Sequence, residues 1–167
     1  MFKQIILPLL GVAVFIIVVG LFIQKSSSLN LLGSKFQTPI ANVEKVITVG
    51  DKKVNVQIAK TNEERSKGLS GTKSLKDDSG MLFIFSAKSS PLFWMKDMLI
   101  PLDMIWITDG KIVKIEKNVP VPAPNTPDNA LKTYSAGQPV DHILEVNAGY
   151  SDKNNINVGE SVDLSAI

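Results

Sequence analysis

One uncharged apolar stretch divides this chain into two parts of different physical character. Residues 5–23 form a run of 19 amino acids without a charge, flanked by Lys3 and Lys25. About 20 apolar residues, each rising 1.5 Å along a helix, cross the hydrocarbon core of a bilayer. The run has no polar face, which argues against a helix on the surface of a water-soluble core. It therefore predicts a single transmembrane helix within a membrane anchor at residues 1–25.

A cleaved signal peptide is the alternative interpretation of this run. The apolar region of a signal peptide spans about 7–15 residues and ends in small residues at the cleavage site. Val18 and Gly20 make a poor site of this kind, and the apolar run continues past them through residues 21–23. We therefore expect a membrane-bound protein, with secretion after cleavage as the alternative.

The orientation of the anchor follows from its position in the chain more than from its flanking charges. Lys3 precedes the run, and Lys25 and Lys35 follow it, so the lysine counts barely discriminate. An N-terminal anchor with a very short leading segment usually leaves the following domain outside the cytoplasm. We expect a single-pass protein of the cell membrane with a cytoplasmic N-terminus. Residues 26–42, rich in serine, predict a flexible tether to an extracytoplasmic domain.

Composition excludes several classes of function for the domain at residues 43–167. The sequence has no cysteine, which removes disulfides, thiolate catalysis and cysteine-ligated zinc. Three of the 18 lysine and arginine residues lie in the first 37 positions, so residues 38–167 hold 15 basic and 16 acidic side chains. A near-neutral domain lacks the positive surface that nucleic acids require. We expect no nucleic-acid partner, no cofactor, and a soluble domain that is monomeric.

Period-two hydrophobic patterns separated by turns indicate a mainly β domain. Val54, Val56 and Ile58 alternate with polar residues after a turn at residues 50–52, which predicts a hairpin. Further strands are expected at residues 80–85, 92–98, 100–107, 112–115, 142–146 and 156–162. Asp109-Gly110 predicts a hairpin turn that leads into the strand at 112–115. We predict a compact, jelly-roll-like β-sandwich or a partly open barrel with one or two short helices.

The first of these helices is marked by a capping box. Thr61 is followed three residues later by Glu64, so each side chain can bond the other's backbone N–H. Gly68 suits the C-terminal end, which predicts a helix of about two turns. Four prolines at positions 120, 122, 124 and 127 predict a loop that crosses the domain.

Five short motifs occur in a fixed order along this domain. They are Thr61-x-x-Glu64-Arg65-x-x-Gly68-Leu69, Gly80-Met81-Leu82-Phe83-Ile84-Phe85, Phe93-Trp94-Met95-Lys96, Ile100-Pro101-Leu102-Asp103-Met104 and Leu144-Glu145-Val146-Asn147-Ala148-Gly149. Together they resemble the family named domain of unknown function 192, whose members are often membrane-associated. The resemblance covers about residues 43–165 and implies a β-sandwich with short helices, without an agreed activity.

Three positions depart from the pattern of that family. Ser70 replaces a usual methionine, Thr72 stands where arginine is common, and Asp97 stands where asparagine is common. The last change matters most, because it adds a negative charge beside Lys96 and alters any interpretation of this loop as an anion site.

Seven polar or aromatic residues are candidates for a ligand-binding site. They are Arg65, Trp94, Lys96, Asp97, Asp103, Glu145 and Asn147. Arg65 is the only arginine in the chain, which suggests a need for its planar, always-charged fork. A tryptophan beside a cation and carboxylates commonly binds a sugar ring or another polar small molecule. The alternatives are that Trp94 is a core residue and that Arg65 pairs with a buried carboxylate.

Asp103 lies inside an apolar strand, where an unpaired carboxylate is costly. We expect it to be coupled to Arg65, directly or through Lys96 and Glu145, in one polar cluster. Asp103 and Glu145 are also the weak candidates for a catalytic pair of carboxylates. His142 is the only histidine and makes a weak zinc site with its acidic neighbours, so no metal is expected.

Three functional hypotheses follow from these residues. The first is a membrane-tethered, non-catalytic binding module for a saccharide or another small polar ligand. The second is a glycan hydrolase that uses Asp103 and Glu145. The third is a structural or assembly partner of another membrane protein. A concavity that gathers the candidate residues favours the first, paired carboxylates across a cleft favour the second, and a broad exposed apolar patch favours the third.

Overall fold

The computed structural model describes residues 44–167. The anchor predicted at 1–25 and the tether predicted at 26–42 lie outside the described residues. Within residues 44–167, no helix is long and apolar enough to cross a membrane. The described elements, in chain order, are β1 (Lys45–Val49), β2 (Lys52–Ala59), α3 (Asn62–Lys67), β3 (Ser79–Ser89), β4 (Phe93–Trp94), β5 (Leu102–Thr108), β6 (Lys111–Val119), the 3-10 helix η1 (Asp128–Ala130), β7 (Thr133–Tyr134), β8 (Val140–Asn147), α4 (Tyr150–Lys153) and β9 (Val162–Asp163).

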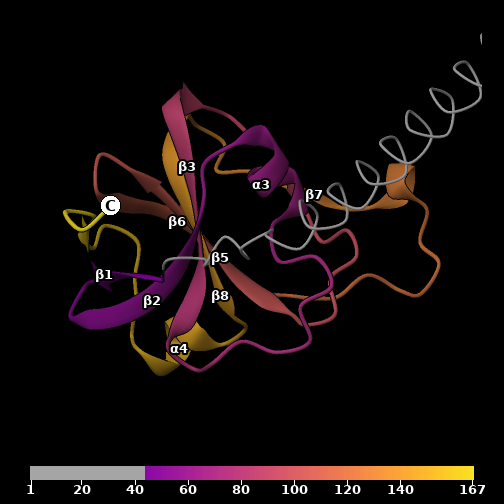
Figure 1. Cartoon of the computed structure of the whole chain (residues 1–167), viewed down its shortest axis with the longest axis horizontal. Coiled ribbons are helices and arrows are strands. Elements are labelled where there is room, and N and C mark those ends of the chain that lie inside the picture. The colour runs from indigo at the N-terminus through magenta and orange to yellow at the C-terminus, as the bar shows by residue number, and fades with distance from the viewer. Residues whose placement is uncertain (1–43) are drawn as a thin grey trace, which may run out of the picture. The chain divides into compact units, whose positions relative to one another are not determined.

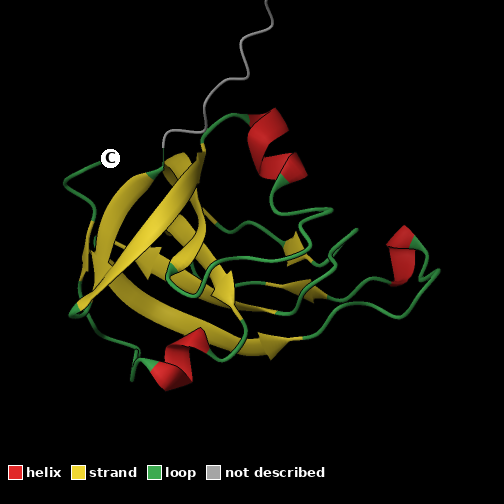
Figure 2. Ribbon diagram, turned by 60° about the horizontal axis from the view of Figure 1, so that its bottom comes forward, coloured by secondary structure: helices red, strands yellow, loops and turns green. Residues whose placement is uncertain are grey.

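Most of these strands form one large curled sheet. Seven strands pair in the order β6-β5-β8-β3-β2-β1-β9, whereas β4 and β7 form a separate two-stranded sheet. Figure 1 and Figure 2 show the large sheet curling into a half-barrel with α3 and α4 beside it. The prediction of a mainly β fold with one or two short helices is confirmed. Of the two predicted architectures, the partly open barrel describes this sheet better than the sandwich.

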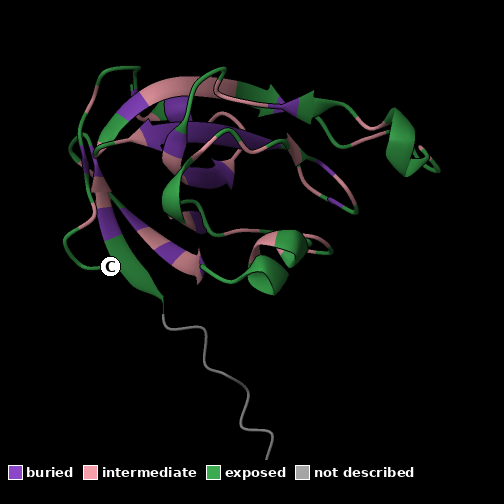
Figure 3. Cartoon of the chain, turned by 90° about the horizontal axis from the view of Figure 1, so that it is seen from above, coloured by how far each residue is buried: buried purple, intermediate pink, exposed green. Residues whose placement is uncertain are grey.

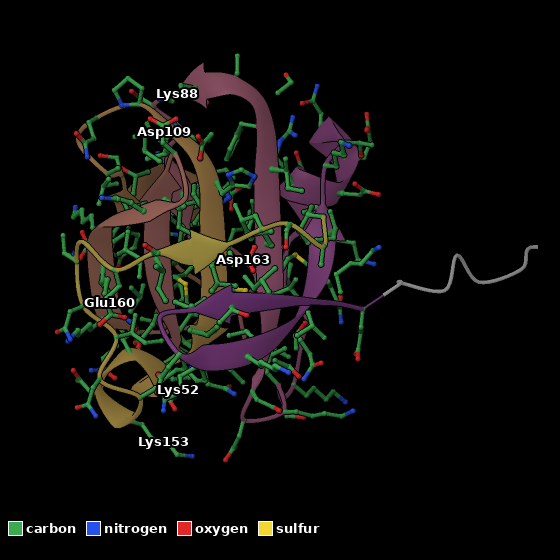
Figure 4. All side chains as sticks on the ribbon, turned by 90° about the vertical axis from the view of Figure 1, so that its left-hand side faces the viewer. Lys52, Lys88, Asp109, Lys153, Glu160 and Asp163 are labelled. Carbon is green, nitrogen blue, oxygen red and sulfur yellow. The ribbon has the colours of Figure 1, made fainter. Side chains whose placement is uncertain are left out.

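Two hairpins form where the sequence predicts them. The turn after β1 joins two antiparallel strands in which Ile47 pairs with Val54. The β5–β6 turn at Asp109 and Gly110 has positive φ at both residues, as a tight two-residue hairpin requires. Asp109 forms an ion pair of 2.6 Å with Lys88 near the end of β3, and Figure 4 shows these two side chains next to each other.

A crossover connection joins β2 to β3. These two strands pair in parallel, with Val56 opposite Gly80. Parallel neighbours cannot be joined by a hairpin, so residues 60–78 run from the C-terminal end of β2 back to the opposite end of the sheet, where β3 begins. This crossover carries α3. At Gly80 a Cβ atom would lie 2.3 Å from the carbonyl oxygen of Glu145, so only glycine lets β3 approach β8 this closely.

Alternate side chains of the central strands point to opposite faces of the sheet and pack into two buried clusters, one on each face. One cluster includes Ile47, Val54, Leu82, Ile105 and Leu144. The other includes Phe83, Met95, Met104, Trp106 and Ile143. Figure 3 shows the buried residues gathered on the strands, while α3 and η1 are largely exposed. The central strands are therefore buried on both sides, although α3 itself has no buried residue.

Two predicted strands are much shorter than expected. The strand predicted at 92–98 is reduced to β4, because Asp97 has a φ of 55° and the N–H of Met98 bonds back to Met95. The strand predicted at 156–162 is reduced to β9 at its very end. The short helix α4 is not predicted by the sequence. It begins after Gly149, which has a left-handed backbone conformation. The proline-rich segment is a loop, as predicted, and contains η1.

Candidate functional site

A concavity of about 380 Å³ lies between the β2–β3 crossover, the second half of β3 and residues 91–98. Its volume is within the range of small-molecule sites, about 300–1,000 Å³. Four of the seven predicted ligand-binding residues line it, namely Arg65, Trp94, Lys96 and Glu145. These residues come from three separate parts of the chain, which only the folded domain brings together.

The wall formed by α3 is held rigidly by its capping box. The hydroxyl of Thr61 accepts a hydrogen bond from the N–H of Glu64, and the carboxylate of Glu64 accepts from the N–H groups of Thr61 and Lys60. These backbone bonds stabilise the charged carboxylate, so they lower the pKa of Glu64. The helix therefore starts at a fixed place above the sheet.

Arg65 fastens this wall to β3. Its guanidinium donates to the carbonyl oxygens of Lys60 and Ile84, at 2.9 Å from the latter, and to the side chain of Asn62. It also lies over the ring of Phe85, 5.1 Å from the ring centre. A planar group with several donors suits this combination, which a lysine could not reproduce. Arg65 therefore has a positioning role within the wall, and its charge faces no carboxylate at ion-pair distance among the described residues.

The chain after α3 is tied to the opposite wall of the concavity. The hydroxyl of Ser70 donates to the carbonyl of Lys96 at 3.0 Å, and the N–H of Gly71 donates to the carbonyl of Asp97 at 2.9 Å. Because these bonds span the two walls, the width of the concavity is fixed by backbone contacts. Ser70, a departure from the family pattern, thus takes part in closing the site.

Trp94 and Lys96 form the rim on the side of residues 91–98. Trp94 is 46% exposed, so it is not the core residue of the alternative interpretation. The Lys96 ammonium lies 5.7 Å from the centre of the indole ring and pairs with Asp128 of η1. The hydrogen bond to Asp128 raises the pKa of Lys96, which keeps this side chain charged. The rim therefore offers an aromatic face with a cation beside it.

Glu145 occupies the floor of the concavity and is the most unusual residue in it. The residue is 4% exposed, and no described residue forms a hydrogen bond or ion pair with its carboxyl group. Its oxygens are not among the fully sealed polar atoms of residues 44–167, so they reach the space of the concavity. Its cross-strand neighbours on β3 and β5 are Met81 and Met104, which offer no donors. Burial raises the pKa of Glu145 to about 8, so the group is mostly protonated at neutral pH.

The walls of the concavity also contain three phenylalanine rings that were not among the predicted site residues. Phe83 and Phe93 pack edge to face with ring centres 4.9 Å apart, and Phe85 lies beneath Arg65. Phe83 and Phe85 are two residues apart on one strand, so the pleat places them on the same face as Glu145's neighbour Met81. That spacing is visible in the sequence, but an apolar strand gives no sign of which face borders a cavity.

The other three candidates have positions outside this concavity. Asp103 is fully buried, and its carboxylate accepts three backbone hydrogen bonds of 2.8–3.0 Å, from Asn118, Gly149 and Ser151. The side-chain amide of Asn147 donates to the carbonyls of Leu75 and Lys76. Asp97 is an exposed turn residue. None of the three lines the site.

The expected coupling of Arg65 to Asp103 is wrong. Backbone N–H groups satisfy Asp103, and backbone carbonyls satisfy Arg65, so neither needs the other. The structure also does not bring Asp103 and Glu145 together. In the register of β5 and β8, Asp103 is opposite Val146 and Glu145 is opposite Met104, so the two carboxyls point to opposite faces of the sheet.

The histidine region contains an internal contact. Nδ1 of His142 lies 2.8 Å from the carboxylate of Asp141, whose other oxygen accepts from the N–H of Asp109. Within residues 44–167 no group of three histidine or acidic side chains could hold a metal ion.

Two solved structures are similar to this domain in fold. A proposed transcription regulator from Sinorhizobium meliloti 1021 is similar with a TM-score of 0.68 and 24% identity, over 77% of this chain and 98% of its own. A protein of unknown function from Novosphingobium aromaticivorans DSM 12444 is similar with a TM-score of 0.66 and 26% identity, over 75% and 89%. No functionally curated protein matches the sequence significantly.

The family assignment rests on most of the domain. The profile of the family DUF192, described as Uncharacterized ACR, matches residues 45–164. This range contains all five motifs noted in the sequence and every residue that lines the concavity. The chain belongs to the DUF192 family.

Proposed function

We propose that this domain is a non-catalytic binding module for a small polar, saccharide-like ligand, held outside the cytoplasm by a membrane anchor at residues 5–23. The observation that carries the proposal is the unpartnered carboxyl of Glu145 on the floor of a concavity with aromatic walls. A buried polar group without a partner costs about 1–3 kcal/mol. Packing alone gives no reason for an acid at this position, whereas a ligand hydroxyl would supply the missing partner.

The shape of the site agrees with a sugar ring. Trp94 offers a flat apolar surface at the mouth, and sugar rings present an apolar face of C–H groups that packs on such a surface. Polar side chains of Asn62, Ser66 and Ser70 border the same space. An aromatic platform with a few polar groups around it is the usual composition of a small-ligand site.

A glycan array followed by isothermal titration calorimetry tests this proposal. The full-length protein is used in a detergent without a sugar headgroup, so that the detergent cannot compete. We expect at least one glycan to bind, and we expect Trp94→Ala and Glu145→Leu each to weaken its binding about tenfold or more. The matched control is Leu99→Ser, an exposed residue beside the site that does not line it. The proposal is contradicted if no glycan binds, or if the control weakens binding as much as the two site variants.

An enzymatic role in glycan hydrolysis has less support. The two carboxyls it requires lie on opposite faces of the sheet, and Asp103 is occupied by three backbone donors. Retaining and inverting glycosidases both need their carboxyl groups to face one scissile bond.

A role as an assembly partner is favoured by one observation, the exposed side chains of Leu92, Trp94 and Leu99 around the mouth. If a protein partner covers this edge, Leu99→Ser disrupts its co-purification while leaving glycan binding unchanged. Cross-linking in intact cells followed by mass spectrometry of the wild-type and variant proteins distinguishes the two roles.

The membrane arrangement has its own test. Alkaline phosphatase fused after residue 167 is active only outside the cytoplasm, whereas a fluorescent protein that folds only in the cytoplasm is then dark. Mass spectrometry of the purified protein reports whether residues 1–25 are retained. An active fluorescent fusion, or a mature chain starting near Leu21, contradicts the anchored extracytoplasmic arrangement.

A further inference from the structure

The charges that border the concavity are unequal in sign. Arg65, Lys67 and Lys96 line it, and Glu145 is the one acidic residue that does so. Among residues 44–167, neither Arg65 nor Lys67 has an ion-pair partner, and Lys96 pairs with Asp128, which lies outside the concavity. Three cations and one acid therefore line the concavity, and no described cation forms an ion pair with the acid.

The floor does not neutralise this excess of positive charge. Glu145 is enclosed by Met81 and Met104 on the adjacent strands and by Phe83 on the wall, so no cation stabilises its ionised form. Burial favours the neutral acid, in agreement with its raised pKa of about 8. At neutral pH the concavity thus presents positive charge at its rim and an uncharged O–H donor at its base.

We propose that the ligand of this site carries an oxyanion, a carboxylate or a phosphate, on a saccharide-like body, and that Lys67 binds it while the fixed charges of Arg65 and Lys96 at the rim favour it. This inference rests on the proposed function and adds the charge of the ligand. The oxyanion lies at the rim, where Lys67 has free donors, and the ring lies against Trp94. A cationic amino sugar is disfavoured, because it meets three like charges at close range.

Glu145 gives this selectivity a dependence on pH. Its own strand contributes Ile143 and Asn147 to the same face, and neither titrates. The charged groups that line the concavity with it are Arg65, Lys67 and Lys96, while Asp97 and Asp128 lie beside Lys96. Ionisation of Glu145 above pH 8 places a negative charge at the base of the site. An anionic ligand is then repelled, while a neutral sugar is affected far less.

Saturation-transfer NMR with four sugars of one ring type tests the inference on the full-length protein. The probes are glucuronate, glucose 6-phosphate, glucose and glucosamine. We expect one or both anionic sugars to bind about tenfold more tightly than glucose, and glucosamine to bind most weakly. The difference between glucuronate and glucose 6-phosphate identifies which oxyanion is preferred.

Three variants test how individual charged residues contribute to the preference for an anionic sugar. Lys67→Gln should reduce the preference for the anionic sugar about threefold or more, whereas Lys73→Gln, on the same crossover but not lining the site, should leave it unchanged. Between about pH 6.5 and about pH 9.5 the wild-type protein should lose affinity for the anionic sugar, and Glu145→Gln should remove this loss.

The possible results separate this inference from the function on which it rests. If glucose binds as tightly as the anionic sugars and depends on Trp94, the charge selectivity is overturned and the binding module stands. If glucosamine binds most tightly, the inference is likewise overturned. If none of the four sugars binds, both proposals fail for this ring type.

Discussion

Asp103 and Glu145 are two buried acids on neighbouring strands with opposite surroundings. Asp103, on β5, accepts three backbone hydrogen bonds, from the end of β6, from Gly149 just before α4 and from Ser151 in the first turn of α4. Glu145, on β8, has no such partner in residues 44–167 and faces a concavity. Two acids that are both buried therefore have different effects on stability. Asp103 joins the end of β6 to the start of α4, whereas Glu145 lacks such partners and costs stability when it is ionised.

The largest effect is expected from removing the satisfied acid. Asp103→Ala leaves three buried N–H groups without an acceptor and should lower the free energy of unfolding by about 3–5 kcal/mol. Asp103→Asn keeps one acceptor oxygen and should lose less. Urea denaturation followed by near-ultraviolet circular dichroism measures both.

Ser151→Ala is the matched control for this experiment. It keeps the backbone N–H that Asp103 accepts and removes a buried hydroxyl that has no partner in the described part of the chain. Its free energy of unfolding should stay within about 1 kcal/mol of the wild-type value. A loss as large as that of Asp103→Ala would mean that Asp103 does not act through its backbone contacts.

The second effect concerns the unsatisfied acid and depends on pH. The pKa of Glu145 is about 8 in the folded protein, above its ordinary value of 4.5, so the folded state holds this proton more tightly. Its contribution to stability is complete below about pH 4.5 and is lost as pH rises towards 8, by roughly 1.4 kcal/mol per pH unit in between. Glu145→Gln removes that slope.

Unfolding midpoints at about pH 5 and about pH 9 in both proteins measure the slope. We expect Glu145→Gln to be more stable than the wild type at the higher pH. Equal pH dependence in the two proteins would show that Glu145 is not buried without a partner, and the contrast with Asp103 would disappear.

Arg65 gives a third, intermediate effect. Arg65→Lys keeps the charge but loses the paired contacts with the carbonyls of Lys60 and Ile84 and the contact with Phe85. We expect a loss of about 1–2 kcal/mol, measured by thermal unfolding. Lys67→Gln, two residues further along the same helix and without an ion pair in residues 44–167, should change stability by less than about 0.5 kcal/mol. If Lys67→Gln lowered stability more than Arg65→Lys, Arg65 would not be the residue that holds α3 against β3.

The smallest effect on stability is expected for Trp94. Because almost half of this side chain is exposed, Trp94→Ala should cost about 1 kcal/mol or less while removing the stacking surface of the proposed ligand. Calorimetric unfolding and ligand binding are measured on the same sample. A large loss of stability would show that Trp94 supports the fold and would weaken its assignment to the site.

Elements that depend on residues close together in the chain could be predicted from the sequence. The capping box at Thr61 and the turn at Asp109 depend on residues three or fewer positions apart, so they could be read directly. The hydrogen-bond partners of Asp103 could not be predicted in this way. Two of its three donors, Gly149 and Ser151, lie more than 45 residues away at the start of α4, whose position depends on the whole sheet. Arg65 was expected to need a carboxylate, but backbone carbonyls satisfied it instead.

Only some residues of the candidate site could be predicted from the sequence. Trp94, Lys96 and Glu145 stood out by residue type, since a polar or amphipathic side chain inside an apolar motif needs an explanation. Phe83 and Phe85 did not, because apolar residues in a strand are expected in any core. Whether such a residue borders a cavity depends on which segment covers that face, and here the cover is the β2–β3 crossover.

The order of pairing around β3 has a consequence for how the site comes into existence during folding. β3 joins β2 in parallel across the crossover and joins β8 some sixty residues later in the chain. Contacts between such distant parts of a chain form slowly, since the loops between them must close first. A chain that ends before β8 lacks both the strand that pairs with β3 and β5 and the acid at the floor of the concavity. The concavity is therefore completed only after β8 has been synthesised and has paired.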